Sequence, residues 1–524
     1  MIFNGKRTLS ALLCILLAMS LLLVSCNTGD TTSNGNTSKD NTSTTSSTGS
    51  SEPGWDEAQQ RWVSSLDANK YKGQNRKFKI LVLGPTYGTY SSREFTFSEE
   101  DVLQSEVIND AAGRKNDYIK EHYGVEIVPI YAENNDTNGI GTLINNDIST
   151  GSKSYDAVMP YLLTLAGFAA EGKLVDMAST SFGDSSLDIT KTIDFSMPWW
   201  DQTSISELSI KDKVFFATGD ITLLNKVCTL SILFNRDLIA TGGYESPYEL
   251  VKSGKWTIDK MVEMGKQNIS DVDGDGKATY KDNWGLASAY GDSIGFYVSS
   301  GNHLATLDAN REPVIALDGA GPKAALQKVL SVLNDRSWVM HAEEIGLSGN
   351  EMWQTALAIF GDGRALFRTS AFSGVEKLKS GFSVNYGIVP MPKLNAEQSD
   401  YYSYVADNGT VSGIAITTGA EDVEFSAYMV EVNAVEGKNY LTPAYYDTVL
   451  KKQAAQDPET KEMLDIIFDN TIYDVGRIYN FGQIATIITE LVKNNSTDIT
   501  SKIDENKSAI EEAMKTIVEK YNSL

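Results

Sequence analysis

The chain has 524 residues, 41 % of them hydrophobic, and its 69 acidic residues outnumber its 45 lysines and arginines. The formal net charge of -24 at pH 7 argues against a nucleic-acid-binding surface and against a basic face that adheres to membranes. The length is enough for two folded domains once an N-terminal leader is removed.

Residues 1–25 are predicted to be a secretory signal peptide. Lys6 and Arg7 precede an apolar run over residues 9–24, which is short for a membrane span. The run ends in Leu-Val-Ser-Cys, and this ending resembles the lipobox of bacterial lipoproteins. The resemblance implies that Cys26 becomes the lipidated N-terminus, with fatty acyl chains such as palmitate. A plain signal peptide followed by a chance cysteine is the alternative.

Residues 26–54 are expected to form a flexible tether, because the segment is mostly Ser, Thr, Asn and Gly and cannot bury a core. A lipid anchor followed by a tether predicts a protein on the extracellular face of a cell membrane, and we expect a Gram-positive bacterium. Cys14 leaves with the leader and Cys26 carries lipid, so no intramolecular disulfide is expected. Cys228 is predicted to be a buried small hydrophobe.

From about residue 75 onward, predicted strands alternate with predicted helices. Strands are expected at 78–83, 125–130 and 155–159, and helices at 98–123 and 142–149. This alternation predicts an α/β fold with a mostly parallel sheet covered on both faces.

A second set of elements follows in the same style. Strands are expected at 214–217, 228–234, 386–389 and 411–417, and helices at 248–252, 257–266, 322–334 and 351–360. The last helix should bury one amphipathic face made by Ile510, Ala513, Met514, Ile517, Val518 and Tyr521. Thr257 is a suitable N-cap for the helix that follows it.

Residues 271–282 have the spacing of a calcium-binding loop. Carboxylates fall at loop positions 1, 3, 5 and 12, and Gly276 at position 6 permits the sharp turn. The closing Asp is shorter than the usual Glu, which predicts a looser, structural site. A solvated acidic turn is the alternative. The expected ligands are Asp271, Asp273, Asp275, the backbone carbonyl of Lys277, and Asp282.

Several short stretches occur in an order that resembles the extracellular solute-binding proteins of ABC importers, family 1, carbohydrate type. They lie at 213–217, 234–238, 254–257, 282–286, 363–367 and 386–392. The resemblance implies a two-lobe periplasmic-binding-protein-like fold of type II, with hinge-connected lobes and a ligand cleft between them. It places the two-lobe domain at 75–524. Lobe 1 would be about 75–185 plus a later return segment, and lobe 2 about 220–365 plus the C-terminal helices.

The function implied by this resemblance is capture of a mono- or oligosaccharide and its delivery to the permease subunits of an ABC importer. The protein would be a monomer without catalytic activity. A lipid-anchored glycoside hydrolase stays open, because acidic residues are abundant and their pairing is a property of the folded chain. A non-catalytic surface adhesin stays open as well.

Sugar recognition requires aromatic faces together with planar polar groups. Trp199 and Trp200 stand next to an acid in a non-periodic segment, with packing under a loop as the alternative. Asp220 follows a glycine after a predicted strand end, a common place for cleft groups. Tyr404 and Asp407 precede a predicted strand and could reach the cleft.

Two catalytic patterns are weak. Residues 291–295 match the nucleophile elbow of serine hydrolases, but the flanks do not read as strand and helix, so a polar turn is expected. Residues 167–173 nearly match a phosphate-binding loop, but Leu174 stands where a hydroxyl must reach magnesium and the stretch looks helical.

Overall fold

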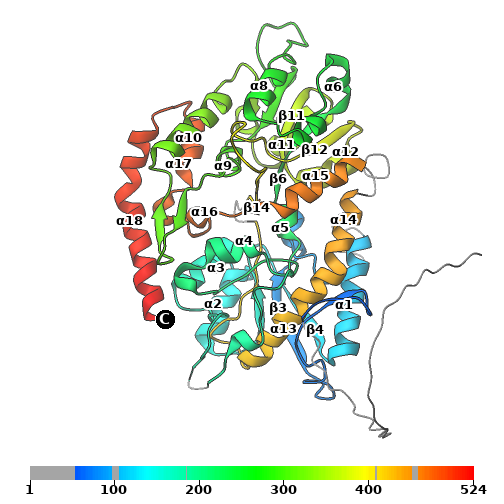
Figure 1. The fold of residues 1–524 in the computed structure, drawn as a ribbon, viewed down its shortest axis with the longest axis vertical. Coiled ribbons are helices and arrows are strands. Elements are labelled where there is room, and N and C mark those ends of the chain that lie inside the picture. Colours follow the sequence, from blue (N-terminus) through cyan, green and yellow to red (C-terminus); the bar gives the residue numbers. More distant parts are fainter. Residues whose placement is uncertain (1–52, 97–105, 184–185, 407–409, 451–457) are drawn as a thin grey trace, which may run out of the picture. The chain divides into compact units, whose positions relative to one another are not determined.

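The computed structural model describes residues 53–96, 106–183, 186–406, 410–450 and 458–524 (Figure 1). The signal peptide, Cys26, nearly all of the tether and Asp407 lie outside the described residues, so their predictions are not tested. Residues 50–524 form one compact unit by themselves.

The first lobe is built on a three-stranded parallel sheet of order β4-β3-β5. The strands are β3 (Lys77–Leu83), β4 (Glu126–Ala132) and β5 (Ala157–Met159). The helices of this lobe are α1 (Glu106–Tyr123), α2 (Ile140–Thr150), α3 (Leu162–Ala170) and, from much later in the chain, α13 (Val423–Glu436). The expected parallel sheet with helices between its strands is confirmed.

Helix α13 is the central helix of the first lobe. Every residue from Phe425 to Glu436 is buried, and this is the pattern of a helix surrounded by protein on all sides. Alternate residues of β3 enter different cores, as the two-residue period of a strand requires. Phe78, Ile80 and Val82 pack with α13 in one hydrophobic cluster, whereas Leu81 and Leu83 belong to the larger cluster that continues through the second lobe.

The segments 214–217 and 411–417, which were predicted to be strands, are extended and are held by isolated bridges. Within 411–417, Ile414 bridges to Ala217 and Ala415 bridges to Val158, all antiparallel. Segment 411–417 therefore lies between β5 and residue 217, although neither this segment nor 214–217 forms a full strand ladder.

The second lobe contains a five-stranded mixed sheet of order β10-β7-β11-β6-β12. Strands β10, β7 and β11 are parallel, and β6 runs antiparallel to both β11 and β12. The strands are β6 (Leu230–Asn235), β7 (Trp284–Ser288), β10 (Val339–His341), β11 (Ala365–Ala371) and β12 (Tyr386–Val389). The helices are α6 (Arg236–Gly242), α7 (Pro247–Lys252), α8 (Ile258–Gly265), α9 (Asp292–Val298), α10 (Ala320–Leu333), α11 (Gly349–Gly361), α12 (Phe372–Gly381) and α15 (Pro458–Asp469).

Short elements connect and extend the lobes. They are the hairpin β1 (Gly54–Asp56) and β2 (Arg61–Val63), α4 (Gln202–Leu208), α5 (Leu224–Val227), the antiparallel pair β8 (Ala305–Leu307) and β9 (Pro313–Ile315), the parallel pair β13 (Ser403–Tyr404) and β14 (Thr471–Ile472), the π-helical turn η6 (Gly437–Leu441), α14 (Thr442–Leu450), α16 (Val475–Tyr479), α17 (Thr486–Lys493) and α18 (Ile499–Ser523). Helix α18 contacts α10, α17, β9 and α3 (Figure 1).

Several local predictions are confirmed. Thr257 caps α8 by accepting a hydrogen bond from the Lys260 amide. The last helix buries Ile510, Met514 and Tyr521 on one face. Cys228 is buried, with 1 % of its surface exposed. Among the described residues, none of the helices combines the length and apolar character that a membrane span requires.

Candidate ligand-binding site

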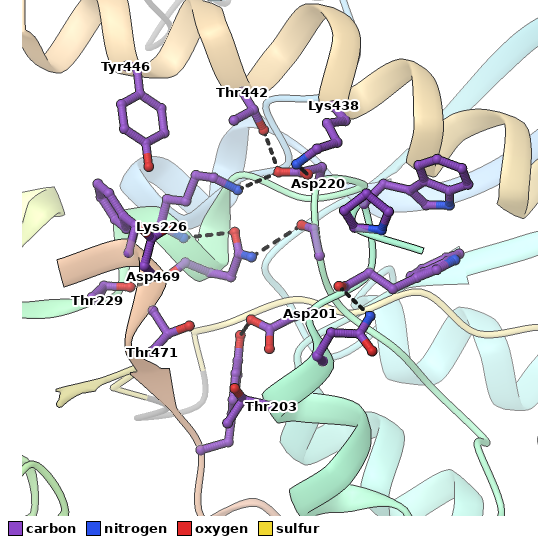
Figure 2. A pocket seen from close by; sticks show the side chains of 18 residues that line it. Asp201, Thr203, Asp220, Lys226, Thr229, Lys438, Thr442, Tyr446, Asp469 and Thr471 are labelled. Atoms are coloured by element: carbon purple, nitrogen blue, oxygen red, sulfur yellow. Dashed lines mark hydrogen bonds and ion pairs between the residues drawn. The ribbon is translucent and has the colours of Figure 1, made fainter. Parts of the chain in front are cut away.

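A polar pocket of about 380 Å³ lies where segments from distant parts of the chain meet (Figure 2). One side is formed by residues 198–203 and 219–229, and the other by η6, α14, the end of α15, and β14. Trp199 and Trp200 in its wall belong to a core cluster of the first lobe. Phe468 and Asp469 come from α15, which packs against β12 of the second lobe, so both lobes line the pocket.

The loop that carries Asp220 is pressed against the Trp199–Trp200 segment. Gly219 has a φ of 155°, and a Cβ built on it would lie 2.3 Å from the carbonyl oxygen of Trp199. Trp200 and Gly219 form an antiparallel bridge, and the Asp220 amide donates to the Trp199 carbonyl at 2.8 Å. A glycine is required at 219 because any side chain would push these two segments apart.

Asp220 is the centre of a buried charge network. Its Oδ1 accepts from Lys226 Nζ at 2.9 Å and from the Thr442 hydroxyl at 2.6 Å, and its Oδ2 accepts from Lys438 Nζ at 3.1 Å (Figure 2). Burial alone would raise the pKa of Asp220, but the charges of Lys226 and Lys438 together with the hydrogen bonds from Thr442 and Lys226 outweigh burial and lower the pKa below its usual value. Two cations share one carboxylate, so this wall carries one excess positive charge.

A second carboxylate faces the pocket from the start of α4. Asp201 caps that helix by accepting from the Ser204 amide at 2.9 Å, and its other oxygen accepts from the Tyr473 hydroxyl at 2.9 Å. Burial raises the pKa of Asp201 above its usual value. Asp469, at the end of α15, lines the pocket too, and its pKa is also raised, first by burial and then by the charge of Asp465.

Trp199 and Trp200 line the pocket, but their rings are almost fully buried, with 0 % and 2 % of their surface exposed. Both indole N–H groups donate to Glu431 of α13, at 3.0 and 2.9 Å. Burial raises the pKa of Glu431 to about 8. In this conformation the indoles fit the packing alternative. They support the wall, and they do not present free faces to a ligand.

The partly exposed aromatic surface of the pocket comes from two other residues. Tyr446 of α14 and Phe468 of α15 are half-buried and lie edge to face, with ring centroids 5.4 Å apart. Sugar rings present an apolar face that stacks on such side chains. Sequence reasoning missed this pair, and the only available signal was an aromatic residue on each of two late helices.

The remaining ligand-site candidates are distributed differently. Tyr404 lies in β13, 3 % exposed, and pairs with Ile472 of β14, so it stands behind the strand whose Thr471 faces the pocket. It is not among the residues that line the pocket. Lys226 and Lys438 were not predicted at all, because a lysine in sequence gives no indication of the carboxylate that it meets after folding.

The predicted calcium loop brings three of its four carboxylates together. Oxygen atoms of Asp271, Asp273 and Asp275 lie within 4.8 Å of one another, all exposed. Gly276 has a φ of 70°, as the sharp turn requires, and its amide donates to Asp271 at 2.9 Å. The oxygens of Asp282 are occupied differently, since they accept from backbone amides of the loop, and this residue is 3 % exposed. The first three acids fit a hard cation with oxygen ligands.

The two weak catalytic patterns have structural explanations. Ser293 of the elbow-like motif is fully buried in α9, and its hydroxyl donates to the Tyr290 carbonyl at 2.5 Å. The expectation of a polar turn at 291–295 is therefore replaced by the start of a buried helix. The phosphate-loop-like stretch begins inside α3, as its helical pattern predicted.

No family model and no curated protein matches this chain. Solved structures do match its fold. A cyclo/maltodextrin-binding protein in complex with maltotetraose aligns over 86 % of this chain and 98 % of its own length, with a TM-score of 0.51 and 13 % identity. The maltose/maltodextrin-binding domain from Bdellovibrio bacteriovorus bound to maltotriose covers 85 % and 100 %, with a TM-score of 0.47 and 13 % identity. The fold is therefore the two-lobe α/β fold of maltodextrin-binding proteins.

Proposed function

We propose that this protein is a receptor that captures a carbohydrate in the pocket around Asp220 and delivers it to an ABC importer. The observation that supports this most directly is the pocket itself. It is bounded by both lobes of a two-lobe fold, and it combines half-buried aromatic side chains with buried polar groups. Function would be binding without chemistry, with closure of the lobes around the sugar.

The chemistry of the walls suits a neutral polyhydroxyl compound. A sugar hydroxyl both donates and accepts a hydrogen bond. Lys226 and Lys438 supply donors, and Asp201 and Asp469 supply acceptors. A volume of about 380 Å³ lies at the lower end of the range for small-molecule sites. A monosaccharide or one end of an oligosaccharide is the proposed occupant.

Membrane attachment belongs to the same proposal. Lipid on Cys26 and the tether that follows would hold the receptor at the extracellular face of the membrane, near the permease that accepts its ligand. Each buried acyl methylene contributes about 0.8 kcal/mol, so more than one chain on the cysteine gives stable anchoring. We propose a monomer with no other membrane contact.

A bound calcium ion is proposed as a structural part of the second lobe. Asp271, Asp273 and Asp275 would hold it, and its charge would offset the mutual repulsion of the three carboxylates. None of these residues lines the ligand pocket. Calcium is therefore expected to stabilise the lobe without entering sugar recognition.

Calorimetric titration of the signal-free protein with maltotetraose and a panel of mono- and oligosaccharides tests the capture of sugar. A bound sugar should also compact the protein in small-angle scattering. Tyr446→Leu should weaken the affinity about fivefold or more, because ring stacking contributes roughly 1–3 kcal/mol. The matched control is Tyr244→Leu, a half-buried tyrosine outside the pocket, which should leave the affinity unchanged.

Two outcomes would overturn the proposal. Release of reducing ends from oligosaccharides during the titration would identify a glycoside hydrolase. Binding to immobilised cell-wall polymer, with no affinity for any soluble sugar, would identify an adhesin.

A further inference from the structure

The N-terminal hairpin β1–β2 packs against the part of the chain that supplies Lys438 to the pocket. The hairpin lies upstream of residue 75, where sequence patterns place the start of the two-lobe domain. It contacts helix α13 and the π-helical turn η6, which separates α13 from α14. Such turns are rare and occur often at functional sites.

Arg61 makes the strongest of these contacts. Its guanidinium forms an ion pair with Glu436, the last residue of α13, whose side chain is 1 % exposed. The same guanidinium lies 3.7 Å from the ring centroid of Tyr118. Burial raises the pKa of Glu436 to about 6, and the Arg61 charge opposes that rise. The arginine therefore compensates a carboxylate that is buried immediately before η6.

Trp62 continues the contact into η6 itself. Its amide donates to Asn439 Oδ1 at 2.9 Å, and Asn439 Nδ2 donates back to the Trp62 carbonyl at 2.9 Å. The Lys438 amine lies 5.2 Å from the centroid of the Trp62 ring. Lys438 is thus held between an aromatic face of the hairpin and the carboxylate of Asp220.

Gly437, the first residue of η6, shows how closely this turn approaches the pocket loop. A Cβ added at Gly437 would lie 2.0 Å from the Asp220 carbonyl oxygen. A small displacement of η6 would therefore move Lys438 relative to Asp220 and would change one wall of the pocket. Thr442, which also donates to Asp220, follows directly after the turn.

We propose that the hairpin β1–β2 is a positioning element of the ligand pocket, in which Arg61 and Trp62 fix η6 so that Lys438 reaches Asp220. This role of the hairpin rests on the proposed function in one respect, namely that this pocket is the ligand site. Arg61, Trp62 and Asn439 act through Lys438 and have no contact with the ligand themselves. The segment that follows the predicted tether is thereby part of the binding machinery.

The test uses Arg61→Ala and measures η6 without any ligand. Amide hydrogen exchange over residues 437–442, and acylation of the Lys438 amine followed by mass spectrometry, should each become about tenfold faster than in wild type. Acylation of Lys226, the other lysine on Asp220, should change less. Arg61→Lys, which keeps the charge, should restore part of the protection.

Arg76→Ala is a matched control. Arg76 pairs with Asp422 at the other end of α13 at 2.8 Å and lies 3.6 Å from the centroid of Phe425, so it has the same kinds of contact far from η6. This variant should leave exchange at 437–442 unchanged. If Arg61→Ala does not fold, Trp62→Leu supplies the same comparison.

Unchanged exchange and unchanged acylation of Lys438 in the hairpin variants would overturn the inference, as would an equal increase in Arg76→Ala. Titration with maltotetraose provides a separate readout, and affinity should fall in Arg61→Ala but not in Arg76→Ala. If the wild type binds no maltotetraose, that result counts against the proposed function. The exchange measurement decides the role of the hairpin in either case.

Discussion

Replacing Asp220 with Asn should destabilise the protein strongly, because among the described residues it is the only carboxylate in contact with both pocket lysines. Side-chain exposures in this network are 10 % for Asp220, 11 % for Lys226 and 21 % for Lys438. At about 3 Å and an effective dielectric of 20, each lysine gains roughly 5 kcal/mol of attraction, most of which offsets desolvation. Removing one partner of such a network typically costs about 3–5 kcal/mol.

Asn keeps one acceptor oxygen, so the lower end of that range, about 3 kcal/mol, is expected for Asp220→Asn. Unfolding entropy of about 2.1 cal/mol/K per residue over roughly 470 folded residues gives about 1 kcal/mol/K. The melting temperature should therefore fall by about 3 °C in differential scanning calorimetry. The double variant Asp220→Asn with Lys226→Met should lose at least ~1 kcal/mol less stability than the two single variants lose in sum, because the second change removes one of the uncompensated charges.

The control is Asp259→Asn. Asp259 pairs with Lys328 at 2.7 Å, closer than either lysine approaches Asp220, but its side chain is 73 % exposed. A surface pair contributes less than about 1 kcal/mol, so the melting temperature should fall by less than about 1 °C. If the two variants lose equal stability, burial does not decide the strength of this network and the reasoning fails.

The pH dependence gives a further check. The pKa of Asp220 is lowered in the folded protein, so its contribution is present above the usual pKa of an aspartate and is lost as pH falls through the folded value. The difference in stability between wild type and Asp220→Asn should therefore be full at neutral pH and shrink in acid. A difference that grows in acid would contradict the assignment of charge to Asp220.

Three other predictions follow from the structure and the sequence. Calcium at 100 times its dissociation constant should add about 2.7 kcal/mol to stability, and Asp273→Ala should abolish that gain in a thermal-shift assay. Burial raises the pKa of Glu207 to about 7. Burial alone would lower the pKa of His303, but the hydrogen bond and the charge of Asp474 act against burial, and the pKa of His303 is raised. Because both pKa values are raised in the folded protein, the stability that each protonated group contributes is lost as pH rises. Glu207→Gln should therefore gain stability relative to wild type between about pH 5 and 8. Cys26→Ala should release the protein from membranes or leave its signal peptide uncut in a fractionation assay, whereas Cys14→Ala should do neither, and a Cys26→Ala protein that is normally processed and membrane-bound would contradict lipidation.

The sequence was sufficient to predict the α/β class because its signals are local and periodic, whereas the two-lobe arrangement was predicted only from the resemblance of short motifs to solute-binding proteins. Residues 78–83 form a strand on an apolar pattern, and 386–389 form another. It misjudged the segments 214–217 and 411–417, which have strand-like composition but meet only single bridging partners. Strand formation requires a neighbour, and the neighbour is set by tertiary contacts that composition does not encode.

The candidate site was predicted only in part, for the same reason. Asp220 was found because a carboxylate after a strand end often faces a cleft. Trp199 and Trp200 were found through their residue type, which did not reveal that Glu431, more than two hundred residues later, would bind both indole N–H groups. Lys438 could not be found, since neither a π-helical turn nor its contact with the hairpin has a signature in the sequence.

The pocket concentrates charges in a place where stability alone would favour apolar packing. Replacing a buried ion pair by well-packed apolar residues is often neutral or stabilising. A leucine in place of Asp220 and methionines in place of Lys226 and Lys438 could therefore supply about as much stability as the charged network does. What apolar residues could not supply is a set of directed donors in the same cavity as the acceptors Asp201 and Asp469. Donors and acceptors around one cavity suit a ligand that both donates and accepts hydrogen bonds, as a sugar hydroxyl does.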